Sequence, residues 1–201
     1  MASTKWAAHP APGRKTSPAA SAGAKAGSIK IETRKIPGTT RGADVIVTVH
    51  YVRSKGIDDF VTNVHAADPL QLIETERKGV AGAFVKDLAK RMEIPAQRMF
   101  DILGVPKATA EKKVAAGELL SSNGGRAALG MARLLGMANE IVENSTAPEA
   151  KDFDTARWLG QWLEKPQPAL GGRKPSELID TPTGLDVVAR LLGAIESGAY
   201  Q

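Results

Sequence analysis

The fold of the last third of this 201-residue chain is decided by the segment WLEKPQPALGGRKPSELID, residues 162–180. It begins as the end of an amphipathic helix and continues with two prolines, an Ala-Leu pair, a double glycine and a third proline. Proline fixes its own φ and glycine tolerates positive φ, so this composition predicts a stiff turn rather than a flexible linker. Because the segment carries no catalytic motif, we interpret it as an interaction surface.

Helical patterns dominate on both sides of this segment. Asp68-Pro69 is typical of an N-cap followed by proline at the first helical position, and Gly79 ends that short helix. Thr181-Pro182 caps a last helix whose apolar residues recur at helical spacing up to Ile195. The same spacing predicts further helices over residues 84–92, 95–104, 107–116, 126–142 and 152–164. The fold class is therefore mainly α.

The N-terminal region follows other patterns. Residues 1–43 hold eight Lys or Arg against one Glu and few apolar residues, which predicts a disordered basic tail. Residues 45–52, VIVTVHYV, alternate as one short strand does. A lone strand needs a partner chain or a second copy to pair with, or else the region is helical despite its propensity. Residues 57–67 fit either a strand or a helix.

Composition excludes several classes of protein. The formal net charge is +5 and cysteine is absent, which excludes disulfides, thiolate zinc sites and cysteine nucleophiles and favours a reducing cytoplasm. No apolar run approaches the roughly 20 residues of a membrane-spanning helix, and the N-terminus lacks the apolar core of a secretory signal. Residues 1–43 and 84–117 are basic and residues 140–201 are acidic. This distribution indicates one polyanionic partner and a second partner of another kind.

Residues 95–104 and 107–116, joined by a short link, have the proportions of a helix-turn-helix. The second helix presents Lys107, Thr109, Lys112 and Lys113, donors that suit phosphates and base edges in a major groove. On spacing alone, a helical hairpin with a solvated lysine face is slightly favoured, because short helix pairs with glycine turns are common. Lysine also lacks the bidentate fork with which arginine recognises bases.

No catalytic pattern emerges. The three histidines, His9, His50 and His65, lack ligand spacing, and no phosphate-loop, dinucleotide, serine-hydrolase or zinc-protease motif occurs. The GGRK turn at residues 171–174 has neither the preceding strand nor the following helix of an anion site. The sequence predicts no enzyme, no cofactor and no metal.

Trp158 and Trp162 lie one helical turn apart, just before the stiff segment. Tryptophans at this spacing are typical of a hydrophobic core or of a protein interface.

The C-terminal residues resemble a known family. WLxxPxPALGG at residues 162–172, PxxLIDTPxG at residues 175–184 and IExGxY at residues 195–200 are similar to the C-terminal domain of the Xre/MbcA/ParS-type antitoxins of bacterial type II toxin–antitoxin pairs. The resemblance is tight over roughly the last 40 residues and looser from about Asp68. Its fixed order of turn residues makes it specific.

The resemblance implies an Xre-like helix-turn-helix domain over residues 68–146, which binds the promoter of its own operon. A small helical toxin-binding domain over residues 147–201 follows, with residues 44–67 as a strand and linker region. The implied partners are a cognate toxin, of the NAD-consuming RES type in many such pairs, and operator DNA bound by a homodimer. The implied toxin contacts are Trp162, Pro168, Leu170, Gly171, Gly172, Gly198, Ala199 and Tyr200.

Two departures concern the DNA-binding part. The family commonly has an arginine-rich recognition helix, where this chain has lysines, and a Ser/Glu-rich start to the next helix, where this chain has Gly124-Gly125. We therefore expect a weaker or differently specific operator site. Three hypotheses remain: an antitoxin that also represses its operon, a stand-alone helix-turn-helix regulator, and a small enzyme. The missing catalytic pattern argues against the enzyme. The first accounts for the stiff segment.

Overall fold

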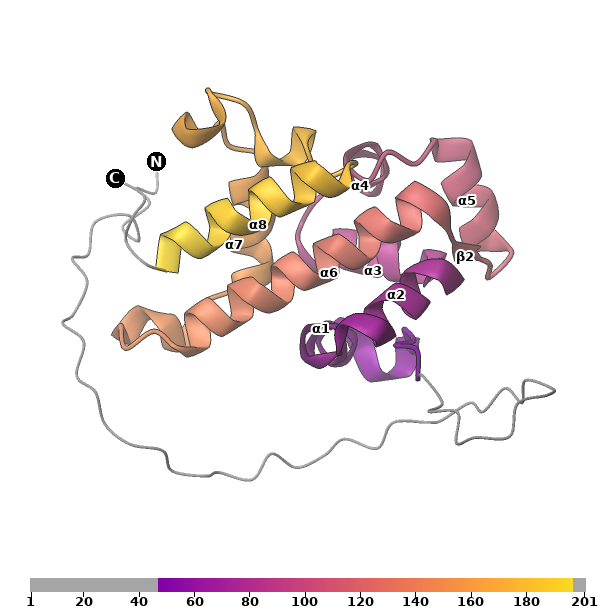
Figure 1. Cartoon of the computed structure of the whole chain (residues 1–201), viewed down its shortest axis with the longest axis horizontal. Coiled ribbons are helices and arrows are strands. Elements are labelled where there is room, and N and C mark those ends of the chain that lie inside the picture. Colours follow the sequence, from indigo (N-terminus) through magenta and orange to yellow (C-terminus); the bar gives the residue numbers. More distant parts are fainter. Residues whose placement is uncertain (1–46, 197–201) are drawn as a thin grey trace.

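The computed structural model describes residues 47–196. This part of the chain is mainly α, as the sequence predicts, and its ribbon is shown in Figure 1. The α-helices are α1 Gly56–Ala66, α2 Pro69–Lys78, α3 Gly82–Arg91, α4 Ala96–Ile102, α5 Lys107–Ala115, α6 Ser122–Glu143, α7 Thr155–Leu163 and α8 Pro182–Glu196. The shorter elements are the 3-10 helices η2 Arg53–Lys55, η3 Pro148–Asp152, η4 Pro168–Leu170 and η5 Pro175–Glu177 and the strands β1 Val80–Ala81 and β2 Leu119–Leu120.

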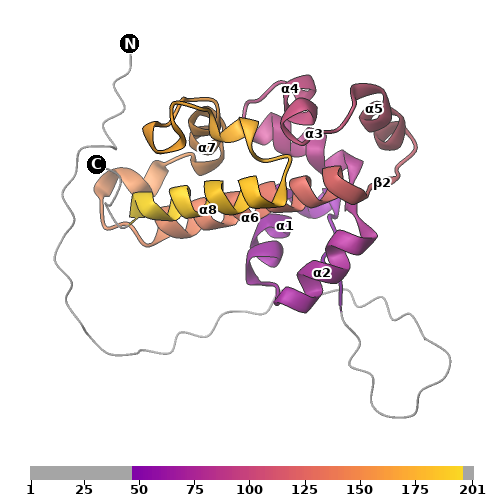
Figure 2. The same ribbon diagram turned by 45° about the horizontal axis from the view of Figure 1, so that its top comes forward.

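The long helix α6 is the axis of the fold. In both views α8 runs along one side of it, and α1 and α2 lie on the other side (Figures 1 and 2). Small residues let these helices approach closely: a Cβ atom on Gly136 would lie 2.8 Å from the His65 Cβ of α1. On the other side, Gly130 accommodates the side chain of Leu185 from α8. The alanines and glycines of α6 therefore set how tightly the molecule packs.

The cap predicted at Asp68 is confirmed. Asp68 Oδ1 accepts hydrogen bonds from the backbone N–H groups of Leu70, at 2.8 Å, and Gln71, at 3.0 Å. The Gln71 side chain accepts in return from the Asp68 backbone N–H at 3.1 Å, which completes a capping box. Gly79 ends α2 with a φ of 94°, a conformation that favours glycine.

The strand predicted over residues 45–52 is wrong in its described part, because residues 47–52 form no strand. The alternating pattern instead reflects one-sided packing against helices. Val49 donates its backbone N–H to Thr75 Oγ1 at 3.0 Å, and the Tyr51 ring makes edge contacts with Phe60 and Phe84. The Tyr51 hydroxyl donates to Asp87 at 2.8 Å, and burial and this hydrogen bond raise the pKa of Tyr51 to about 12. Of the undecided residues 57–67, those up to Ala66 are helical and belong to α1, and Ala67 is its extended C-cap.

The described residues do form one small sheet, which the sequence did not predict. β1 and β2 pair antiparallel, with Val80 opposite Leu120. β1 precedes α3 and β2 follows α5, so the ladder joins the two ends of the segment that contains α3, α4 and α5. α6 begins directly after β2. A Cβ atom on Gly125 would overlap the Leu120 carbonyl oxygen, and one on Gly124 would overlap the Val105 side chain. The glycines thus permit close approach, and α6 begins at Ser122, four residues before the predicted start at residue 126.

Buried residues from all parts of the described chain form one hydrophobic cluster. Phe60, Phe84 and Phe100 contribute from the first half, and Leu159, Leu163 and Val188 contribute from the second. The cluster therefore continues across the predicted boundary between residues 146 and 147. The division into four regions stays a prediction. Of the helices within residues 47–196, none is both long and apolar enough to cross a bilayer.

Candidate functional site

The helix α7 leads into the stiff segment and is fixed at its start. The Asp154 carboxylate caps it by accepting from the Arg157 backbone N–H at 3.1 Å, and it also accepts from the Arg91 side chain of α3 at 2.6 Å. Burial raises the pKa of Asp154, but these two hydrogen bonds and the neighbouring cations outweigh burial and lower it overall. The direction of α7 is therefore set by an ionic contact with α3.

An aromatic row lies along α7. The Trp158 and Trp162 rings stack with their centroids 6.1 Å apart, and Phe153 lies 6.0 Å from Trp158 on the other side. Trp162, an expected toxin contact, is only 7% exposed and belongs to the core. Trp158 is half-buried and offers more of its ring to a partner.

The loop after α7 closes around Gln167, a polar residue that is only 6% exposed. Its side-chain amide donates to the Lys165 carbonyl at 3.1 Å and the Trp162 carbonyl at 3.4 Å. Its backbone N–H donates to the Arg173 carbonyl at 3.0 Å, and its carbonyl accepts from the Gly172 N–H at 3.0 Å. A buried amide satisfied by backbone carbonyls fixes the loop in one conformation.

The double glycine turns the loop back. Gly171 has a φ of 65° and Gly172 a φ of 81°, in the region that residues with a Cβ atom rarely adopt. A Cβ atom on either would meet nothing within 4 Å, so backbone conformation and not space requires glycine here. Pro168, Gly171 and Gly172 are exposed, and Leu170 is half-buried against the core. Four of the expected toxin contacts are thus placed together on one rigid turn.

An ionic network ties the loop to α4. The Arg98 guanidinium donates to both carboxylate oxygens of Glu164, at 2.7 and 3.2 Å, and to Ser176 Oγ at 3.2 Å. Lys174 Nζ donates to the same carboxylate at 3.3 Å. Burial raises the pKa of Glu164, but the hydrogen bonds from Arg98 and Lys174 and their charges outweigh burial and lower it overall. Glu164 therefore joins both ends of the loop to α4.

The start of α8 depends on close backbone approach. The Gly184 N–H donates to Thr181 Oγ1 at 3.1 Å, so the predicted cap at Thr181 is confirmed. A Cβ atom on Gly184 would overlap the carbonyl oxygen of Leu178. Glycine is therefore required where α8 meets the turn before it. The expected toxin contacts Gly198, Ala199 and Tyr200 lie outside the described residues, just beyond the end of α8 at Glu196.

A second candidate surface is the pair α4 and α5. Gly104 lies in their connection with a φ of 64°, and Val105 packs into the core behind it. Lys107, Thr109 and Lys112 are exposed, as a recognition helix requires, whereas Lys113 is half-buried and its Nζ donates to the Leu119 carbonyl at 2.9 Å. The structure thus leaves three of the four expected DNA contacts facing solvent and uses Lys113 to hold β2.

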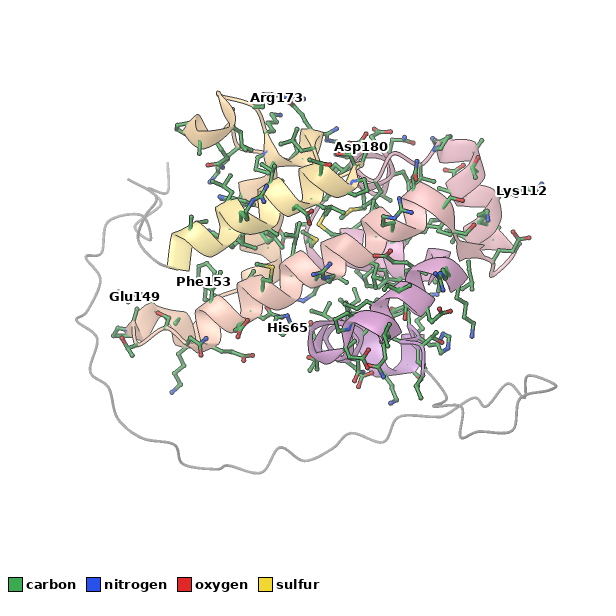
Figure 3. The ribbon with its side chains drawn as sticks, viewed as in Figure 1. His65, Lys112, Glu149, Phe153, Arg173 and Asp180 are labelled. Carbon is green, nitrogen blue, oxygen red and sulfur yellow. The ribbon has the colours of Figure 1, made fainter. Side chains whose placement is uncertain are left out.

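The two surfaces lie on different sides of the molecule. Figure 3 shows Arg173, beside the double glycine, on one side and Lys112 of α5 on another. Sequence reasoning missed the groups that hold the loop: Arg98, Glu164, Lys174 and the buried Gln167. Their partners lie far apart in the chain, so no local pattern reveals them. Among residues 47–196, no three His, Asp or Glu side chains gather where a metal ion could bind.

Comparison with known proteins agrees with this geometry. Residues 152–198 match the family described as the Antitoxin Xre/MbcA/ParS C-terminal toxin-binding domain, and they include α7, the loop and α8. The chain is also 38% identical over 149 residues to the Prs ADP-ribosylating antitoxin of Sphingobium sp. (strain YBL2). That similarity spans 74% of this chain and 92% of the relative.

Proposed function

This chain belongs to the Xre/MbcA/ParS-type antitoxins, and from that premise we propose that it neutralises its cognate toxin by covering the toxin's active site. The observation that carries the proposal is the fixed turn around Gln167, which continues through η5 into α8. Neutralisation of this kind needs no chemistry, only a surface that already has its bound shape. A rigid surface loses less conformational entropy on binding than a flexible one.

Two contact regions form the proposed toxin-binding surface. The first is the turn of Pro168, Gly171 and Gly172, which are exposed, and the half-buried Leu170, together with Trp158 and the mostly buried Trp162 of α7. The second is the end of the chain at Gly198, Ala199 and Tyr200, which follows α8. Because α8 packs along α6, its direction is fixed up to Glu196, and the sequence continues from there to these three residues. We propose that they enter the toxin's cleft.

The proposed toxin is an NAD-consuming enzyme of the RES type. The relative from Sphingobium is named for ADP-ribosylation. The printed name attaches this activity to the relative itself, and transfer of ADP-ribose uses NAD as the donor. The assignment of NAD consumption to the toxin rests on the resemblance. The antitoxin itself carries no reaction in this proposal and acts in the cytoplasm.

The second activity we propose is repression of the antitoxin's own operon. Lys107, Thr109 and Lys112 on α5 are exposed, and Lys107 approaches only the equally exposed Glu111 among residues 47–196, at 3.9 Å, so the three side chains can reach phosphates and base edges. A homodimer would place two such helices about 34 Å apart, one turn of DNA. The surface is lysine-based, so we expect much of its affinity to come from phosphate contacts and to fall steeply with salt.

The test is to express the chain together with the product of the neighbouring gene and to purify both through a tag on one of them. The proposal predicts a stable complex, consumption of NAD by the partner alone, and loss of that consumption when the chain is added. A partner that does not bind, with operator binding retained, would instead make the chain a stand-alone regulator. A partner that binds but does not consume NAD would refute the RES assignment alone.

A further inference from the structure

Glu93 occupies a position at the end of α3 where the chain has glycine at the ends of α4 and α5. The three helices end in the same way: the backbone N–H at this position donates to the carbonyl three residues back, and the next N–H donates to the carbonyl five residues back. The φ at this position is 64° in Gly104, 66° in Gly117 and 56° in Glu93. Such a φ is unfavourable for a residue that carries a Cβ atom. Ser122 is the only other residue of 47–196 that adopts a positive φ without being glycine.

The side chain of Glu93 does little to offset this backbone strain within the fold. Its Oε2 lies 3.0 Å from Nε of Arg157 in α7, and the two side chains are 58% and 55% exposed. Ion pairs as exposed as this one add little to stability. Glycine at residue 93 would relieve the strain and keep both backbone hydrogen bonds. Stability alone therefore favours glycine, and strain that is retained in this way is typical of a functional position.

Arg157 belongs to a stripe of α7 that faces the end of α3. Asp154 and Gly160 lie three residues before and after it, on the same side of the helix. The Asp154 carboxylate pairs with Arg91 at 2.6 Å, and a Cβ atom on Gly160 would overlap the carbonyl oxygen of Met92. With the ion pair of Arg157, three consecutive residues at the end of α3 each contact this stripe. The contact at Arg157, one turn after that at Asp154, restricts the tilt of α7.

We propose that Glu93 is a positioning residue for toxin binding. Its carboxylate holds Arg157, and through Arg157 it holds the helix that carries Trp158 and leads into the turn of Gly171 and Gly172. Glu93 is kept in place of glycine because glycine would leave α7 without this contact. The inference rests on the proposed toxin-binding surface, and the effect of Glu93 on the toxin passes through Arg157.

The experiment measures stability and toxin binding in the same full-length variants, with the purified product of the neighbouring gene as the binding probe. Glu93→Gly removes both the strain and the ionic contact. We expect the midpoint of its urea denaturation to equal or exceed that of wild type. Toxin affinity, measured by titration calorimetry, should fall roughly threefold to tenfold, because α7 must then be ordered on binding. A residue that only supported the fold would change both quantities in the same direction.

A charge swap tests whether Glu93 acts through Arg157. Arg157→Glu alone brings two carboxylates together, so toxin affinity should fall. Adding Glu93→Arg restores an ion pair with its charges exchanged, so affinity should recover. The matched control is Glu118→Gln, which removes an exposed carboxylate between α5 and β2, outside this contact, and should leave toxin affinity unchanged.

Three results would overturn the inference while leaving the antitoxin function in place. They are wild-type toxin affinity in Glu93→Gly, a loss of stability in that variant that matches its loss of affinity, and no recovery in the double variant. A wild-type chain that does not bind the toxin would overturn the proposed function, and the inference with it.

Discussion

The loop after α7 and the helix α5 are built on opposite principles. The loop is polar and rich in turns, yet its centre is buried: Gln167 is enclosed by backbone carbonyls, and Glu164 is held by two cations. α5 is regular helix, yet Ala110 is its single fully buried residue. Irregular backbone is here the more firmly held of the two. Secondary structure alone is therefore a poor guide to which surface is rigid.

This difference suits the two partners proposed. A protein partner with a fixed cleft is best met by a surface that is ordered before binding, because little entropy is then lost. DNA phosphates form a regular array of charge that flexible lysines can contact in several ways. Substitutions in the loop should therefore change shape and stability, whereas substitutions on α5 should change charge and leave the fold intact.

The largest effect on stability is expected at the start of α8, where Gly184 meets the turn before the helix. Gly184→Ala places a methyl group against the Leu178 carbonyl and should lower the free energy of unfolding by about 3 kcal/mol, as overpacking does. Gly193→Ala is the matched control in the same helix, where a Cβ atom meets nothing within 4 Å. It should raise stability by about 0.5–1 kcal/mol through helix propensity. Urea denaturation compares them, and equal effects would refute the close approach.

The next effect concerns the double glycine. Gly172→Ala keeps all neighbours clear but forces alanine to a φ of 81°, at a cost of about 1–2 kcal/mol in the free energy of unfolding. We expect toxin affinity to fall further than this loss of stability explains, because the turn itself is the proposed contact. Gly172→Asn should recover part of the stability and part of the toxin affinity, since asparagine tolerates positive φ better than alanine does. Titration calorimetry with the toxin and thermal unfolding separate the two effects.

A smaller effect is expected at the link between the loop and α4. Arg98→Ala should lower the free energy of unfolding by about 1 kcal/mol at neutral pH, because Arg98 is 39% exposed and water screens its ion pair. The pKa of Glu164 is lowered in the fold, so the contribution of its ionised form is present above its ordinary pKa of 4.5 and is lost as the pH falls below that value.

The difference in stability between wild type and Arg98→Ala should therefore shrink in acid. Chemical denaturation at neutral pH and at successive pH values below 4.5 measures it. Arg173→Ala is the control, because within residues 47–196 that side chain pairs with the exposed Glu177 beside the loop and not with Glu164. A difference that stays constant with pH would show that the Glu164 carboxylate does not hold the loop through its charge.

The smallest effect on stability is expected on α5. Replacing both Lys107 and Lys112 with alanine should leave the free energy of unfolding within about 0.5 kcal/mol of wild type. If each contacts one phosphate, the slope of log affinity for operator DNA against log salt should become shallower by about 2. Lys113→Ala should lower the free energy of unfolding, because the contact with the Leu119 carbonyl is lost. It should change the salt slope less than the double substitution does. Fluorescence anisotropy across a salt series tests both.

The part of the fold that depends on local patterns could be predicted from the sequence. The caps at Asp68 and Thr181 and the apolar spacing of α8 each involve a few neighbouring residues, and all are confirmed. The strand predicted around Val49 was wrong because alternation reports one buried face, whether that face packs on a sheet or on helices. β1 and β2 were missed because two-residue strands carry too little pattern.

The candidate site divides in the same way. The turn at Gly171 and Gly172 follows from glycine's tolerance of positive φ, which is a local property. The clamp of Arg98 on Glu164 joins residues 66 positions apart, and Gln167 looks like any polar loop residue in the sequence. Stiffness of the loop could therefore be predicted, but the groups that produce it required the tertiary structure.

In the proposed mechanism, the segment after α8 occludes the toxin. The most direct measurement is the growth of cells that express the cognate toxin with either the full chain or a chain that ends after Ile195. The loop and nearly all of α8 remain in the shortened chain, so its fold can be checked by circular dichroism. We expect the cells to grow with the full chain and to be poisoned by the toxin with the shortened one. Normal growth with the shortened chain would contradict this mechanism.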